Sequence, residues 1–175
     1  MSRTERQRLV IGISGASGVA YGLRALDACR EMGVESHLVM SRAAALTLAS
    51  ETTLSVADVG ARADAFHKVS DVGASIASGS FKTLGMIVAP CSVRTMSEIA
   101  TGVTASLLTR AADVTLKERR PLVLLVRETP FHLGHLLGRH PPQPRTARMG
   151  APSQRANGLP SRSRRTVCGS TPRQW

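Results

Sequence analysis

The first three quarters of the chain alternate between short apolar runs and segments with helical periodicity. The apolar runs predict buried strands over residues 8–13, 35–40, 86–89 and 121–126. Apolar residues spaced three or four apart predict helices over residues 18–32, 43–50, 92–101 and 106–117. Residues 51–83 are weakly patterned, and we expect short helical pieces and turns there. Alternating strands and helices indicate an α/β fold, a Rossmann-like three-layer sandwich whose parallel sheet is covered on both faces.

The net charge divides the chain into two parts. The total of +11 would suggest nucleic-acid binding, but residues 1–138 hold all 12 acidic residues and a net charge of only +3. Residues 139–175 carry +8 on eight arginines, together with six of the nine prolines, and show no helical or strand period. We therefore predict a folded domain over 1–138 and a disordered Arg/Pro-rich tail over 139–175. Because the domain itself carries so little net charge, we do not expect nucleic acid as its partner. We also expect no membrane partner, because its longest aliphatic run, 122–126, is too short to cross a bilayer.

Small, hydroxylated or charged residues follow the predicted strands. Ligands bind at the carboxyl ends of strands in open parallel sheets, so these segments predict one candidate site. The segments are Gly12–Gly18, Ser41 with Arg42, Pro90–Thr95 and Arg127–Pro130.

The glycine turn Gly12–Gly18 allows backbone N–H groups to approach an anion at the start of the next helix. Its G-x-x-G-x-x-G spacing, and the lack of an acidic residue after the second strand, argue against NAD. It is not a Walker A loop, because no Gly-Lys-Ser/Thr follows. A mononucleotide or another phosphate ligand stays open, beside the alternative that the glycines only pack the first helix on the sheet.

Charged residues directly after the last strand are the strongest catalytic candidates. Arg127 is placed to bind a phosphate, and Glu128 to act as a general acid or base. The alternative is a structural ion pair at a strand exit. The hydroxyls between Ser92 and Thr95 are by themselves best explained as helix N-caps.

Cysteine and histidine residues offer weaker candidates. Cys91 follows a strand, but a small buried residue is a better interpretation than a nucleophile because no histidine is near in sequence. His132 and His135 lack a third ligand for a metal. Three cysteines without framework spacing indicate a reduced, cytoplasmic protein.

Five segments together resemble the flavin prenyltransferases of the UbiX type, in order and spacing, from about Arg8 to Leu136. They are GISGASG, MSRAA, APCSVRTMSEIATG, LLTRAADVTLKERRPLVLLVRETP and HLGHL. The resemblance implies a protein that binds FMN and transfers a dimethylallyl group from dimethylallyl phosphate to reduced FMN, without a metal. It also implies a homo-oligomer and a UbiD-type decarboxylase as the recipient of the prenylated FMN.

The resemblance also assigns roles to residues at the strand ends. It implies phosphate contacts to the prenyl substrate from Lys117 and Arg127, with Glu128 as the catalytic acid/base and Ser17 as a catalytic proton relay near flavin N5. Arg110 matches an arginine of the electrostatic frame of the site. The implied flavin contacts come from Gly15, Ala16, Ser17, Ser41, Ser92, Val93, Arg94, Thr95 and Arg127.

The resemblance stops at Leu136. Such proteins continue with a helix, a further strand and a last helix, which supply a tyrosine and a basic residue to the prenyl-phosphate pocket. We interpret residues 139–175 as an out-of-frame translation, with a genuine basic tail as the alternative. Missing C-terminal elements predict exposed apolar surface on the sheet. They also leave an alternative function, an FMN-binding protein impaired in catalysis. A flavin-dependent cysteine decarboxylase shares the fold but is expected to use an early catalytic histidine, and none lies near the first helix.

Overall fold

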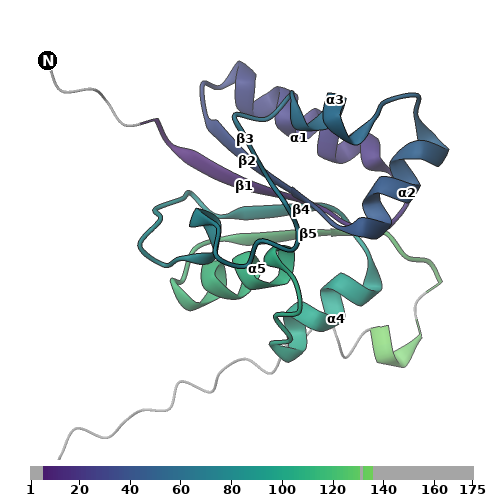
Figure 1. Cartoon of the computed structure of the whole chain (residues 1–175). Helices are drawn as coiled ribbons and strands as arrows, with labels where there is room; N and C mark the ends of the chain where they lie inside the picture. Colours follow the sequence, from purple (N-terminus) through teal and green to yellow (C-terminus); the bar gives the residue numbers. More distant parts are fainter. Residues whose placement is uncertain (1–5, 131, 136–175) are drawn as a thin grey trace, which may run out of the picture. The chain divides into compact units, whose positions relative to one another are not determined.

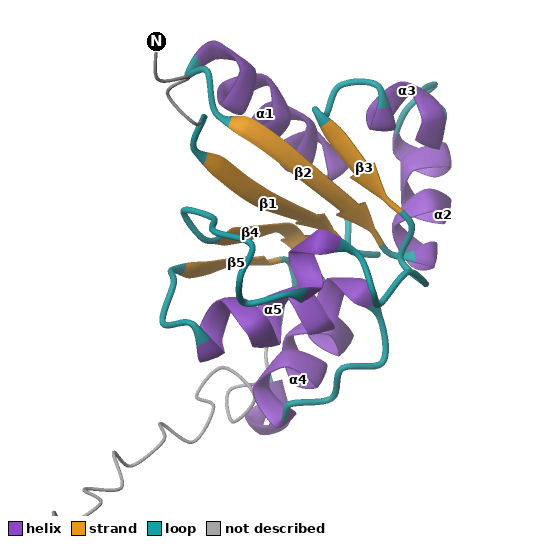
Figure 2. Cartoon of the chain, turned by 60° about the vertical axis from the view of Figure 1, so that its left-hand side comes forward, coloured by secondary structure: helices purple, strands orange, loops and turns teal. Residues whose placement is uncertain are grey.

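The computed structural model describes residues 6–130 and 132–135. It confirms the predicted α/β class: five parallel strands form one sheet in the order β3-β2-β1-β4-β5, with helices on both faces (Figures 1 and 2). The strands are β1 (Arg8–Ile13), β2 (Glu35–Met40), β3 (Ala65–His67), β4 (Met86–Cys91) and β5 (Leu122–Val126). The helices are α1 (Val19–Glu31), α2 (Arg42–Glu51), α3 (Val56–Gly60), α4 (Val93–Thr101) and α5 (Leu107–Lys117), with a 3₁₀ turn η1 (Ser75–Ala77).

The core has two layers, one on each face of the sheet. Ile11 and Ile13 of β1 pack in the layer with α1, α2 and α3, whereas Val10 packs in the layer with α4 and α5. Figure 1 shows these two groups of helices on opposite faces of the sheet. This alternation follows from the two-residue period of a strand. At Gly12 a Cβ atom would lie 3.1 Å from Met86, so a glycine allows close packing there.

Two elements differ from the predicted pattern. The strand β3 lies in the weakly patterned segment and pairs with β2, but its three residues are too few to show a period. The strand β4 continues through Pro90 to Cys91, beyond its predicted end at Ala89. Its pairing with β5 is irregular between Val88 and Cys91, which gives a proline room within a strand.

The edge strand β5 is covered on one face only. Leu122, Leu124 and Val126 pack against the layer with α5, but Val123 and Leu125 are 53% and 39% exposed. Within the described residues this strand therefore has one open face. The helix α1 packs against β1 and β4, and within residues 6–130 and 132–135 no helix covers β5 on that side. The sequence predicts apolar exposure of this kind, and the C-terminal region on which that prediction depends lies outside the described residues.

The described residues contain no helix long and apolar enough to cross a membrane. The predicted boundary between residues 138 and 139 and the whole tail lie outside the described residues.

Candidate active site

Backbone hydrogen bonds tie neighbouring strand ends together at the carboxyl edge of the sheet. Ser41 N donates to Ile13 O at 2.9 Å and joins the end of β2 to β1. Arg127 N donates to Cys91 O at 3.1 Å and joins β5 to β4. The segments that the sequence places at one edge are therefore brought together.

The buried hydroxyl of Ser14 joins the two central strands. Its Oγ donates to Pro90 O at 2.9 Å and accepts from Ser92 N at 2.7 Å. Because Ser14 is fully buried, these bonds satisfy a polar group that would otherwise be costly inside the core. The bonds fix the glycine turn against the start of α4.

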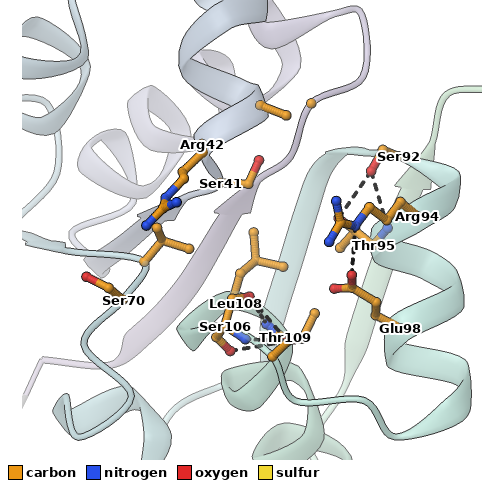
Figure 3. Close-up of a pocket in the computed structure, with 14 residues that line it drawn as sticks. Ser41, Arg42, Ser70, Ser92, Arg94, Thr95, Glu98, Ser106, Leu108 and Thr109 are labelled. Carbon is orange, nitrogen blue, oxygen red and sulfur yellow. Dashed lines mark hydrogen bonds and ion pairs between the residues drawn. The ribbon is translucent and has the colours of Figure 1, made fainter.

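Three helix N-termini face a first cavity of about 580 Å³ (Figure 3). Ser41, Ser92 and Ser106 are the N-caps of α2, α4 and α5, and each hydroxyl accepts a backbone hydrogen bond from its own helix, at 3.1, 3.3 and 3.4 Å. The N-terminus of a helix carries partial positive charge, so three together favour an anionic ligand. The capping interpretation of Ser92 is thus confirmed, and the same residue also lines the cavity.

Further polar side chains border this first cavity. Arg42 begins α2, and Arg94 lies in the first turn of α4 with its Nε 2.8 Å from Glu98 Oε1 (Figure 3). Thr95 and Thr109 add hydroxyl groups from the first turns of α4 and α5. A cavity of this size with convergent hydroxyl and guanidinium groups suits a phosphate-bearing ligand of the size of a nucleotide.

A second cavity of about 470 Å³ lies beside the first and shares Gly15 and Ser92 with it. Arg127 and Glu128 line it, and both are exposed. Arg127 Nε donates to Ser17 O at 3.4 Å, which brings the glycine turn to the end of β5. The remaining lining residues are Ala16, Ser17, Val126 and Thr129.

Gly15 is required by packing as well as by the cavities. A Cβ atom at Gly15 would overlap the Cβ of Ala43 in α2. Close packing of the turn on α2 therefore requires a glycine at this position. The same residue lines both cavities.

Glu51, at the end of α2, occupies the N-terminus of α1. Its carboxylate accepts from Gly18 N at 2.9 and 3.0 Å and from Val19 N at 2.9 Å. The amides of these two residues, which the glycine turn was expected to offer to a phosphate, are therefore already bonded within the protein. The backbone hydrogen bonds from Val19 and Gly18 lower the pKa of Glu51, and the Ser17 hydroxyl and the charge of Arg127 lower it further. The sequence patterns do not single out this carboxylate.

Three of the residues that the resemblance names do not line either cavity with their side chains. Lys117 ends α5 beside Glu118, with 4.0 Å between Nζ and Oε1, near the start of β5. Arg110 pairs with Asp113 at 3.2 Å. The side chain of Val93 packs against the core.

The weaker candidates line neither cavity. Cys91 is fully buried, and burial raises the pKa of its thiol to about 12, which fits the small buried residue that the sequence suggests. The rings of His132 and His135 lie 3.5 Å apart between centroids. Throughout residues 6–130 and 132–135 there is no group of three or more residues suited to hold a metal ion.

Comparison with known proteins places the chain in a family. The Flavoprotein family model matches residues 1–136. The flavin prenyltransferase UbiX of Escherichia coli K12 is 60% identical over 131 residues, which are 74% of this chain and 69% of that protein. The chain therefore belongs to the Flavoprotein family and, within it, to the flavin prenyltransferases of the UbiX type.

Solved structures agree with this assignment. The crystal structure of AnUbiX (PadA1) with FMN and dimethylallyl pyrophosphate matches at a TM-score of 0.76 and 46% identity, over 77% of this chain and 71% of that one. A dodecameric FMN-dependent UbiX-like decarboxylase from Escherichia coli O157:H7 matches at a TM-score of 0.74 and 49% identity, over 75% of this chain and 73% of that one. The resemblance seen in the sequence is confirmed.

Proposed function

We propose that this protein is a flavin prenyltransferase that joins the dimethylallyl group of dimethylallyl phosphate to reduced FMN. The observation that carries the proposal is the pair of adjacent cavities that share Gly15 and Ser92. One cavity has the helix termini that suit a phosphate, and the other has an arginine and a glutamate that suit departure of a second phosphate. The alternative of an impaired FMN-binding protein finds no support in the comparisons.

The first cavity fits the phosphate and ribityl chain of FMN. Its anion-binding groups are the N-termini of α2 and α4, with the hydroxyls of Ser41, Ser92 and Thr95 and the guanidinium of Arg94. Ser106 and Thr109, which the sequence patterns do not single out, extend the polar wall. Gly15 leaves room where the two cavities meet, and Ala16 and the backbone of Val93 complete the proposed contacts.

FMN, when bound, supplies the nucleophilic ring positions that accept the prenyl group. Arg127, at the second cavity, stabilises the phosphate that leaves as the allylic C–O bond breaks. Glu128 donates a proton to that phosphate or removes the proton from the alkylated ring carbon. Ser17 holds a proton beside the ring, with its hydroxyl oriented toward Glu51.

Lys117 is proposed to reach the prenyl phosphate from a second copy of the chain. It ends α5 before the amino end of β5, whereas Arg127 follows the carboxyl end of β5, and the five residues of that strand span roughly 16 Å. This separation along the strand favours a lysine from a second copy at the phosphate that Arg127 binds. The relative from Escherichia coli O157:H7 is a dodecamer, which supports a homo-oligomer here.

The remaining assignments follow from family membership. We place FMN binding in the domain over 1–138 and assign no part of the function to 139–175. The product is proposed to serve a UbiD-type decarboxylase in the cytoplasm, and no metal takes part.

Anaerobic incubation of the full chain with reduced FMN and dimethylallyl phosphate tests the proposal. Mass spectrometry of the extracted flavin should show the gain of one dimethylallyl group. The Glu128→Gln variant should bind FMN as the unaltered chain does and convert it about 10²–10⁴-fold more slowly. Glu31→Gln, which alters an exposed carboxylate at the end of α1, is the matched control and should react normally. Unchanged flavin mass with the unaltered chain would overturn the proposal.

A further inference from the structure

Three titratable side chains form a hydrogen-bonded row between β2 and β3, outside both cavities. His37 Nε2 lies 3.0 Å from Glu35 Oε1, and His37 Nδ1 lies 3.0 Å from His67 Nε2. The two imidazole rings stack at 5.3 Å between centroids with 16° between planes. His37 is only 5% exposed, so the row lies largely within the protein.

The bonding pattern fixes where protons sit. An ionised carboxylate only accepts, so His37 donates from Nε2 to Glu35. A neutral His37 then accepts at Nδ1, and His67 must donate from Nε2. One added proton is accommodated on His37 if His67 changes tautomer and accepts instead. A second added proton sets two N–H groups against each other at 3.0 Å, and the bond is lost.

Arg8 and Phe81 contact the other members of the row, Glu35 and His37. Arg8 Nε, from β1, lies 3.5 Å from the second oxygen of Glu35. The guanidinium of Arg8 also lies 4.9 Å from the Phe81 ring centroid, and that ring meets His37 edge-on at 4.9 Å. The positive charge of Arg8 offsets the stabilisation that the Glu35 carboxylate would give to imidazolium rings in the row.

His67 is the member of the row that resists protonation. Burial and the neighbouring His37 lower its pKa, and Asp71 opposes them in part. A histidine whose pKa is lowered by folding stabilises the folded form above the ordinary histidine range. That contribution is lost as the pH falls below about 6.5 toward the lowered value.

The row is connected to the wall of the first cavity. His67 is the last residue of β3, and Val69 and Ser70, two and three residues further on, line that cavity (Figure 3). Val69 O accepts from Leu107 N at 2.8 Å, in the first turn of α5, beside the N-cap Ser106. Displacement of β3 from β2 would therefore move both the loop and the helix terminus that it holds.

We propose that the hydrogen-bonded pair His37–His67 is a pH-sensitive latch that holds Val69, Ser70 and the start of α5 at the cavity wall. At neutral pH the pair is bonded and the wall is in place. In mildly acidic solution double protonation separates the rings, loosens β3 and weakens ligand retention. The proposal rests on the proposed function only in taking FMN as the ligand of that cavity.

FMN affinity of the full chain at about pH 7.5 and about pH 5 tests the latch. Affinity should fall severalfold more in the unaltered chain than in His67→Gln, because only the unaltered pair can lose its hydrogen bond by taking up a second proton. A glutamine amide can donate or accept toward His37 and does not titrate. The phosphate of FMN, with a pKa near 6, titrates equally in both proteins and cancels in the comparison. The variant His132→Gln, outside the row, should keep the profile of the unaltered chain.

Hydrogen exchange at the Leu107 amide gives a second measurement that needs neither FMN nor a variant. Its exchange, corrected for the intrinsic pH dependence, should accelerate in the acidic range together with the loss of affinity. Absent FMN binding at pH 7.5 would overturn the proposed function but leave this measurement to decide the latch. Protection of Leu107 that does not change with pH, or identical affinity profiles for the unaltered chain and His67→Gln, would overturn the latch.

Discussion

The carboxylate of Glu51 accepts hydrogen bonds from Gly18 N at 2.9 and 3.0 Å, and so connects the end of α2 to the start of α1. It also receives a bond from Val19 N at 2.9 Å. Because the Ser17 hydroxyl and the charge of Arg127 contribute to lowering its pKa, this carboxylate also belongs to the electrostatic surroundings of the second cavity. One acidic side chain thus stabilises a helix terminus and orients a proposed proton carrier.

The variant Glu51→Gln should slow prenyl transfer by at least tenfold and change FMN affinity little. The amide keeps one acceptor for the helix amides, but it removes the negative charge beside Ser17 and Arg127. The expected cost in the free energy of unfolding is about 0.5 kcal/mol, typical of an exposed charge at a helix N-terminus. Single-turnover kinetics and chemical denaturation measure the two effects.

The control for Glu51 is Glu31→Gln, an exposed carboxylate whose pKa is lowered by Arg24 far along α1. It should leave turnover unchanged. Equal kinetic losses in both variants would show that Glu51 has no particular role in the site.

The contribution of Glu51 to the free energy of unfolding should depend on pH. It should be present above the ordinary carboxylate pKa and disappear as the pH falls through the lowered pKa of Glu51.

Lys117 and Glu128 should complement each other between copies of the chain. Lys117→Ala and Glu128→Gln should each abolish most activity, because each removes a group from every site. Co-expressed chains that assemble at random should regain roughly a quarter of the full activity, since one site in four then draws both native residues from its contributing copies. Activity assays on the purified mixed oligomer measure this. No recovery in a verified mixed oligomer would place Lys117 outside the shared site.

Gly15→Ala should destabilise the domain and impair ligand binding together. The added Cβ overlaps Ala43, so the turn must move away from α2 at a cost of about 1–3 kcal/mol. Gly33→Ala is the control, because nothing lies within 4 Å of a Cβ there, although its φ of +68° carries a smaller backbone cost. Thermal unfolding and FMN titration are the measurements. A Gly15→Ala protein that binds FMN normally would contradict the role of close approach at this turn.

The long apolar strands of this fold are predictable from the sequence. Short strands, and elements that depend on contacts between distant parts of the chain, are not. The strands β1 and β2 are found with the predicted bounds, because buried strands leave unbroken local patterns. The strand β3 has three residues and lies at an edge, so its pairing with β2 determines it and its own sequence does not.

The site shows the same division. The segments after β1, β2, β4 and β5 are predictable, because parallel strands place their carboxyl ends at one edge. Ser106 could have been found from the sequence, because it forms a capping box with Thr109 at the start of α5. A helix that leads into β5 runs antiparallel to it, so its first residues lie at the same edge of the sheet. Glu51 carries no such local signal, since its role depends on a contact with Gly18, 33 residues away.

The exposed face of β5 should govern the solution behaviour of the domain. Val123 and Leu125 are exposed on an edge strand, an arrangement that favours association. The double variant Val123→Thr/Leu125→Thr places β-branched residues suited to a strand at both positions, so it should lower aggregation measured by light scattering without loss of thermal stability. Leu124→Thr, on the face packed against the core, is the matched control and should cost about 1–3 kcal/mol. If the double variant instead dissociates a defined oligomer, this face is an interface between copies and not a surface left open by missing elements.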